Sequence, residues 1–180
     1  DSTIFAHENI RKRLKHKHGE ASDFLPVVTY EEGIKFHFNQ DTIHVRHLPA
    51  GHTDGDSYLW FEKANVIHTG DMFFHNRFPY VDLDGGGTVN GYIAGVKHIL
   101  NTMPKDAIII PGHGPVTNHA DYQNFLVMME ETVSYVRAQK ASGKSMAQVI
   151  DAGLGEKWAA WSWSFIPEKR WIETIYKDKG

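Results

Sequence analysis

The first half of the chain alternates apolar and polar residues in short runs, a pattern typical of half-buried β-strands. The segment Gly33–Leu48 reads GIKFHFNQDTIHVRHL, and its polar centre at residues 39–41 predicts the turn of a hairpin. DSYLWF and NVIHTG predict a second strand pair joined by residues 62–65. The continuously apolar run in DAIIIPGHGP, residues 106–115, predicts a strand that is buried on both faces.

Helical periodicity dominates the second half. Apolar residues recur at three- and four-residue spacing over residues 89–100 and again over residues 120–140, which predicts two amphipathic helices. SMAQVIDAG predicts a short helix, and IPEKRWIETIYK predicts a C-terminal one. A polar helix is also expected over Phe5–Gly19, followed by a loop in EASDFLPVVTYEE. Strands followed by helices predict an α/β fold, a mixed sheet covered by helices.

Two further segments affect the picture. The stretch from Met72 to Thr88 is rich in aromatic residues and glycine, and it is expected to be a long loop with a functional role. Four tryptophans gather near the end of the chain, and we interpret them as core or inter-helix packing. They are Trp158, Trp161, Trp163 and Trp171.

Composition restricts the classes of function. The chain has 180 residues, a net charge of −3 and no cysteine, which excludes disulfides, thiolate catalysis and cysteine-based zinc sites. This charge balance favours neither a nucleic-acid nor a membrane partner, and we interpret the basic run RKRLKHKH as a solvated helix end. No apolar run is long enough to cross a bilayer. The compartment stays open between the cytoplasm and the periplasm or exterior.

Three metal-binding residue types recur at the ends of predicted strands. His52 lies in the loop AGHTDGD, Asp71 follows the strand NVIHTG, and His113 follows the strand IIIPG. Ligands gather at strand ends in open α/β folds. Imidazole and carboxylate without thiolate suit zinc, and also iron or manganese. Each residue alone is more often part of an ordinary turn, and only the repetition favours a metal site.

The stretch PAGHTDGDSYLWFEKANVIHTGDMFF followed by IIIPGHGP resembles the metallo-β-lactamase superfamily of metallohydrolases. This resemblance implies an αββα sandwich, of which residues 1–180 would form the C-terminal part as a single domain. It also implies a site with two metal ions, most often zinc. His52 would bind the first ion, Asp71 would bridge both, and His113 would bind the second.

The implied chemistry is hydrolysis of a small-molecule substrate by a metal-bound hydroxide. The substrate class stays open among thioesters, lactams, esters and phosphodiesters. An aspartate at position 71 makes lactams the less expected substrates without excluding them. Asp56, Thr53 and Thr69 are expected to orient the ligands, with Asp54 and His68 as weaker candidates. His75, Arg77 and Tyr80, in the Met72–Thr88 loop, are expected to touch the substrate.

The superfamily's His-x-His-x-Asp-His signature does not occur in the sequence. The nearest string, HKHGEA, ends a basic helix, and it has Glu20 and Ala21 in place of the last Asp and His. No catalytic acid–base residue is therefore assigned. We expect a domain truncated at its N-terminus that binds metal weakly and is inactive alone. Uncovered sheet edges and apolar faces would then favour pairing with another copy or with the lost N-terminal segment.

Two alternatives remain open. One is a metal-free or incomplete relative that serves as a binding or assembly module. The other is a redox protein that binds iron and passes electrons to a flavin, which would require additional domains.

Overall fold

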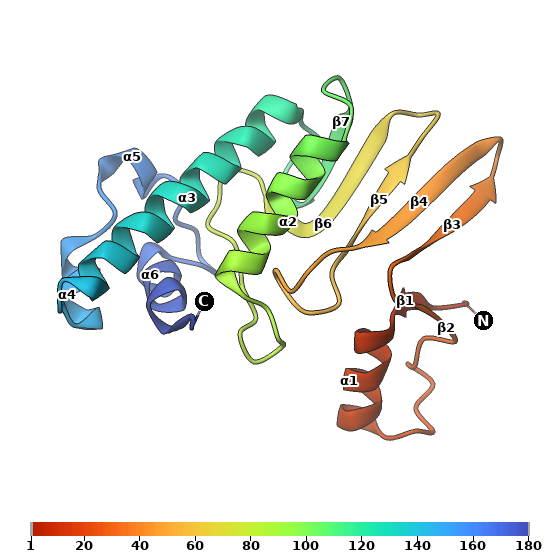
Figure 1. The fold of residues 1–180 in the computed structure, drawn as a ribbon, viewed down its shortest axis with the longest axis horizontal. Helices are drawn as coiled ribbons and strands as arrows, with labels where there is room; N and C mark the ends of the chain where they lie inside the picture. The colour runs from red at the N-terminus through yellow and green to blue at the C-terminus, as the bar shows by residue number, and fades with distance from the viewer. Residues whose placement is uncertain (1, 180) are drawn as a thin grey trace.

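The computed structural model describes residues 2–179 and contains a mixed five-stranded sheet in the order β3-β4-β5-β6-β7, with helices packed beside it (Figure 1). The strands are β1 (Phe5–His7), β2 (Val28–Tyr30), β3 (Gly33–Phe38), β4 (Asp41–His47), β5 (Ser57–Phe61), β6 (Val66–Phe74) and β7 (Ile108–His113). The helices are α1 (Glu8–His18), α2 (Val89–Thr102), α3 (His119–Ala141), α4 (Met146–Ala152), α5 (Glu156–Ala159) and α6 (Glu168–Lys177). The prediction of a mixed sheet covered by helices is confirmed.

The β3–β4 hairpin forms as the sequence predicts. Its two turn residues, Asn39 and Gln40, have φ angles of 51° and 63°. Two successive left-handed residues make the type I′ turn, whose twist matches that of paired strands. The turn sets the register, in which Ile34 lies opposite Val45 and Phe36 lies opposite Ile43. One face of the hairpin is therefore apolar.

Strand direction explains why one rim of the sheet collects polar residues. β4, β5 and β6 are successively antiparallel, and β7 runs parallel to β6. The C-terminal ends of β4, β6 and β7 consequently lie at the same rim. The β6–β7 pair is parallel because α2 carries the chain back across the sheet between the two strands.

Helices α2, α3 and α6 bury the main core. α2 and α3 pack against β6, and α6 packs against α3 (Figure 1). Fully buried rings such as Phe73, Tyr92, Tyr122 and Phe125 fill the space between these elements. Trp158, Trp161 and Trp171 are also buried, so their predicted packing role is confirmed.

The opposite face of the sheet is apolar but half-exposed. Register places Val45, Leu59, His68 and Ile110 in one row across this face, so His68 is the one polar residue of the row. Ile108 is 49% exposed, so the prediction that β7 is buried on both faces is wrong. β7 is an edge strand with helices on one side only, although an isolated bridge between Ile109 and Thr117 covers part of its edge.

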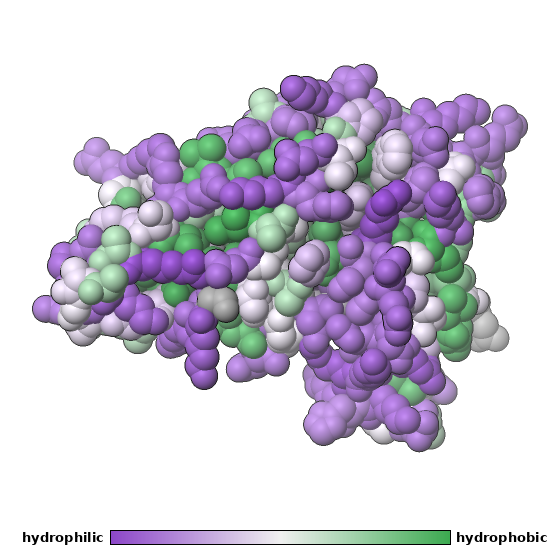
Figure 2. Space-filling view, in the orientation of Figure 1, coloured by the Kyte–Doolittle hydropathy of each residue, from purple (hydrophilic) through white to green (hydrophobic). Residues whose placement is uncertain are grey.

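The N-terminal residues form a small unit beside β3. β1 and β2 pair in parallel, and α1, which follows β1 in the chain, lies beside the strand pair (Figure 1). The expected helix over Phe5–Gly19 thus begins only at Glu8, and the expected loop contains β2. Strands of three residues are too short to leave an alternating pattern in the sequence. α1 buries no residue, and Figure 2 shows hydrophilic side chains over it, which agrees with a solvated helix. Within residues 2–179, no helix has the length and apolar character needed to span a membrane.

A pair of stacked histidines joins this unit to the sheet. The rings of His7 and His47 stack with centroids 3.7 Å apart, and His7 is buried. Burial lowers the pKa of His7, and the neighbouring His47 lowers it further, against weaker raising effects of Glu31 and Asp54. The folded protein therefore prefers neutral His7.

This preference predicts a loss of stability in mild acid. Unfolded His7 titrates near 6.5 and folded His7 titrates lower, so the stabilisation present above pH 6.5 is lost as the pH falls below it. Urea unfolding at pH 7.5 and pH 5 should show this loss, and His7→Asn should reduce it while keeping a side-chain acceptor for the first turn of α1. An unchanged pH dependence in the variant would contradict the prediction.

Candidate metal centre

The shared rim brings together the three residues proposed as ligands. His52 lies in the β4–β5 loop, Asp71 lies in β6, and His113 is the last residue of β7. His52 Nε2 lies 3.5 Å from Asp71 Oδ2, and His113 Nε2 lies 3.5 Å from Asp71 Oδ1. Each oxygen of one carboxylate therefore faces a different imidazole. Asp71 was expected just past its strand, but β6 continues to Phe74 around a bulge, so the expected Met72–Thr88 loop begins only after Phe74.

The spacing of these atoms suits bound cations. Two ligands at about 2.1 Å from a zinc ion, at a tetrahedral angle, lie about 3.4 Å from each other. The observed 3.5 Å contacts match this separation, and they are long for direct hydrogen bonds. Each cation position would, however, receive only one histidine and one Asp71 oxygen. Accordingly, among the described residues no three His, Cys, Asp or Glu side chains surround a single ion position.

Asp56 contacts the ring nitrogen of His52 that does not face Asp71. Its Oδ1 lies 3.4 Å from His52 Nδ1, and its carboxylate also accepts hydrogen bonds from the backbone N–H and the hydroxyl of Thr53. Burial lowers the pKa of His52, but the contact with Asp56 and the charges of Asp56 and Asp71 outweigh it and raise the pKa. A carboxylate on Nδ1 holds the proton there and leaves Nε2 free to face Asp71, as in carboxylate–histidine–zinc sites.

We expect Asp56→Asn to weaken zinc binding by about tenfold to a hundredfold, because the amide cannot hold the His52 proton as the carboxylate does. Competition with a chromophoric zinc chelator measures the change. Asp54→Asn is a matched control, because Asp54 lies in the same loop but pairs with Arg13. Equal zinc affinities of the two variants would contradict an orienting role for Asp56.

Two buried tyrosines, not assigned to the site from sequence, hold the backbone beneath Asp71. The Tyr92 hydroxyl donates to the carbonyl oxygen of Asp71 at 2.5 Å, and the Tyr122 hydroxyl donates to that of Met72 at 3.1 Å. Burial raises the pKa of both far above the usual range, so both hydroxyls remain donors. Their places in the apolar stripes of two helices predicted burial, and buried tyrosine hydroxyls need a partner.

Thr69 acts on the backbone and not on a ligand side chain. It is fully buried, and its hydroxyl donates to the carbonyl oxygens of Gly70 and Ile110 at 3.3 Å. Gly70 has a φ angle of 53°, which glycine adopts without strain. The bond to Ile110 ties β6 to β7 where both strands approach the rim. His68 accepts from the Gly70 N–H at 3.1 Å, so both residues stabilise the bulge that precedes Asp71.

Gly112 allows the close approach of β7 to Asp71. A Cβ at this position would lie 2.4 Å from Asp71 Oδ1. Any other residue would therefore displace the carboxylate. The ring of His113, next in the chain, stacks on Phe74 with centroids 4.6 Å apart and an interplanar angle of 13°. Stacking limits the orientations of the His113 imidazole.

The residues predicted to touch a substrate lie at different distances from this centre. Tyr80 packs edge-on against His52, with ring centroids 5.7 Å apart. Arg77 lies over the ring of Trp163, 5.2 Å from its centroid, and Trp163 lies beside His113. The side chain of His75 points elsewhere, toward Asp121 at the start of α3, with Nε2 and Oδ2 3.5 Å apart.

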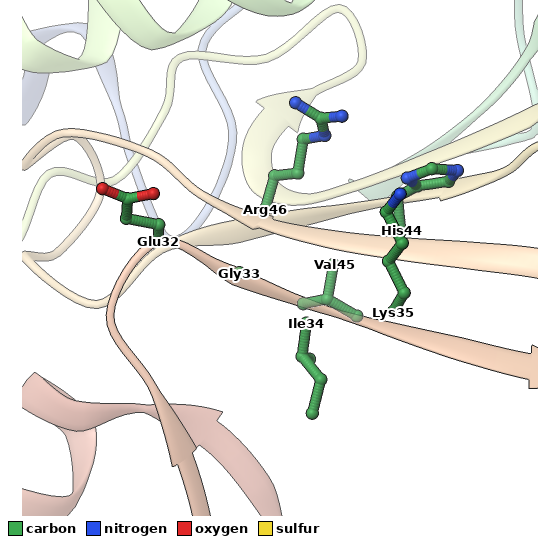
Figure 3. Close-up of a pocket in the computed structure, with 7 residues that line it drawn as sticks. All are labelled: Glu32, Gly33, Ile34, Lys35, His44, Val45 and Arg46. Carbon is green, nitrogen blue, oxygen red and sulfur yellow. The ribbon is translucent and has the colours of Figure 1, made fainter.

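A separate hollow of about 300 Å³ lies over β3 and β4, away from these ligands. Figure 3 shows its lining side chains, with Arg46 and Ile34 projecting from opposite faces of the strand pair. It contains none of the residues that contact Asp71. We therefore place the candidate site at the rim around Asp71.

Comparison with known proteins settles the family. The sequence-family model of the metallo-beta-lactamase superfamily matches residues 3–113, which include all three candidate ligands. The chain belongs to the metallo-beta-lactamase superfamily. A protein of Aquifex aeolicus (strain VF5), described as uncharacterized, is 35% identical over 88 residues, 49% of this chain and 41% of that protein. The "Probable metallo-hydrolase YqgX" of Bacillus subtilis (strain 168) is 28% identical over 68 residues, 38% of this chain and 32% of that protein.

Solved structures confirm the metallo-beta-lactamase fold. A metallo-beta-lactamase from Pontibacter korlensis superposes with a TM-score of 0.60 at 14% identity, covering 71% of this chain and 58% of that one. The BLEG-1 B3 metallo-beta-lactamase superposes with a TM-score of 0.56 at 22% identity, covering 69% and 65%. The aligned region spans less than half of each curated relative named above, 41% and 32% of their lengths.

Proposed function

We propose that this chain is part of a metal-dependent hydrolase in which Asp71 bridges two divalent cations, most suitably zinc. The observation that supports it is the placement of each Asp71 oxygen 3.5 Å from a different imidazole nitrogen. Such cations lower the pKa of water to supply a nucleophile at neutral pH and polarise the oxygen of the substrate. Iron and manganese accept the same ligand types.

The residues of the chain would hold and orient this centre. Asp71 would supply one oxygen to each cation, while the Tyr92 hydroxyl holds the backbone carbonyl group of Asp71. Asp56, whose Oδ1 lies 3.4 Å from His52 Nδ1, would keep the proton of His52 on that nitrogen. The side chains of Asp71 and His113 are 37% and 44% exposed, so a substrate can reach the site from solvent. Thioesters, esters, lactams and phosphodiesters are the candidate substrate classes.

We propose that the chain by itself binds metal weakly. Structural zinc sites use four ligands and catalytic sites use three plus water, whereas each position here receives two. Elemental analysis of the desalted protein after zinc loading should give well below two metal ions per chain. Two tightly held ions would contradict this proposal.

The hydrolase proposal is tested by supplying additional ligands. Fusion of an N-terminal segment that carries the superfamily's histidine-rich signature should raise the zinc content to two ions. It should also produce activity in a screen of thioester, lactam, ester and phosphodiester substrates. Folded protein that still takes up no metal would instead support the alternative of a metal-free binding module.

We also propose that another copy covers the free edge of β3. Among the described strands β3 pairs only with β4, and Phe38 at its end is 64% exposed. Unpaired strand edges beside apolar side chains favour edge-to-edge pairing. Light scattering at high concentration should detect a dimer, and a clean monomer would contradict the proposal.

A further inference from the structure

A continuous series of rings runs from one side of Asp71 to the other. Consecutive ring centroids lie between 5.5 and 6.0 Å apart, with interplanar angles from 45° to 65°. We call this set the ring series, and its members in order are His52, Tyr80, Phe165, Trp163 and His113. Since its first and last members both contact Asp71, the aromatic members flank the candidate metal centre.

Two guanidinium groups lie on the aromatic members of this series. The Arg77 guanidinium carbon is 5.2 Å from the centroid of Trp163. That of Arg170 is 5.2 Å from Tyr80 and 4.8 Å from Phe165. Within residues 2–179, neither arginine has a carboxylate oxygen within 4.0 Å, although Arg170 donates one hydrogen bond to the Phe165 carbonyl oxygen at 3.0 Å. Both arginines thus retain donors for an external anion.

Phe165 is an exposed ring on a well-anchored backbone. Its side chain is 48% exposed, yet the next residue, Ile166, is buried, and Trp161 is buried nearby. The indole N–H of Trp163 donates to the carbonyl oxygen of Phe78 at 2.9 Å. The segment therefore presents the Phe165 ring to solvent in a fixed position, next to Arg170.

The charges around Arg170 limit what can bind there. Tyr80 and Arg170 border a hollow of about 220 Å³ that is also lined by Lys177 and by three carboxylates. The carboxylates belong to Asp82, Asp84 and Glu173. They repel a group with several negative charges. A single carboxylate, which a guanidinium can bind in a bidentate manner, fits this balance better than a phosphate.

We propose that the ring series and its arginines recognise an aromatic group that carries one carboxylate. On this inference, which rests on the proposed hydrolase function, the substrate is an aryl-containing acyl compound. Its aromatic group packs on Phe165 and Tyr80, and its carboxylate contacts Arg170. The bond to be hydrolysed then lies toward Asp71.

Binding of small probes to the metal-free protein tests this subsite independently of catalysis. With a metal chelator present, the dissociation constants of phenylacetate, phenylacetamide and acetate are measured by ligand-observed NMR. Phenylacetate should bind about tenfold more tightly than either of the others, because only it has both the ring and the charge. Equal binding of all three probes, or of phenylacetate and acetate, would overturn the proposal.

Variants assign the contacts. Arg170→Met should weaken phenylacetate binding until its dissociation constant equals that of phenylacetamide, and it should leave the dissociation constant of phenylacetamide unchanged. Arg170→Lys should retain part of the preference for phenylacetate over phenylacetamide. Phe165→Ala should weaken both aromatic probes about fivefold. Arg46→Met, which removes an arginine from the distant β3–β4 hollow, serves as the control. Phenylacetate binding that is insensitive to both Arg170 variants would contradict the inference.

Failure of this proposal and failure of the hydrolase function give different results. Selective phenylacetate binding in a protein that never gains metal or activity would refute only the function. Hydrolysis of simple acetyl esters as fast as of carboxylate-bearing aryl esters, together with no selective probe binding, would refute only the subsite.

Discussion

Asp71→Ala should abolish hydrolysis in the protein with its full set of ligands, lowering the rate by at least about a thousandfold. The variant should also lose at least one of two bound metal ions, because among residues 2–179 only Asp71 has its two carboxylate oxygens 3.5 Å from His52 and His113. Elemental analysis and the initial rate on the best substrate of the screen measure both effects together.

Two further variants sharpen this test. Asp71→Asn keeps the shape of the side chain but removes its charge, so it should lose most of the activity as well. Asp106→Ala changes an exposed aspartate just before β7, at the opposite end of that strand, and should keep both metals and full activity. Full activity of Asp71→Ala would rule out a bridging carboxylate.

Trp171→Ala should cause the largest loss of stability, about 3–5 kcal/mol in the free energy of unfolding. Trp171 is fully buried in α6, stacks on Phe78 with centroids 6.2 Å apart, and donates its indole N–H to the Thr132 hydroxyl at 3.0 Å. The substitution removes the ring and leaves a cavity between α3 and α6. Urea unfolding gives the free energy, and the melting temperature should fall by roughly 10 °C.

Tyr135→Ala is the matched control for this loss. Tyr135 lies in α3 but is 37% exposed, so its removal should cost less than about 1 kcal/mol. Similar losses in the free energy of unfolding for Trp171→Ala and Tyr135→Ala would show that α6 contributes little to the stability of the core. Trp171 stacks on Phe78, which lies between Arg77 and Tyr80 in the chain. Trp171→Ala should therefore also weaken phenylacetate binding, because it removes the ring that holds this segment in place.

Local pattern was sufficient for much of the fold. The β3–β4 hairpin, the helices α2, α3, α4 and α6, and the position of His52 in a loop all follow from periodicity and turn chemistry. These features depend on residues within one short segment, so the sequence expresses them directly. The short pair β1–β2 was missed because its partners are more than twenty residues apart and each has three residues.

The candidate site was only partly visible in the sequence. His52, Asp71 and His113 were identifiable because each is near a strand end, and Asp56 because of its place in the same loop as His52. Tyr92 and Tyr122 were assigned to the core, since periodicity shows burial but not which carbonyl a hydroxyl meets. Trp163 was assigned to packing, whereas it also lies beside His113.

The sequence alone determined the mixed sheet with covering helices and the residue types that this chain can offer a metal, which do not include cysteine. The tertiary structure decided that Asp71 faces two histidines at once. It also decided that Arg170 lies on Phe165, a member of the ring series that flanks Asp71. The physical reason is distance along the chain. Contacts between residues 52, 71, 113 and 165 depend on strand directions and helix packing, which no local pattern records.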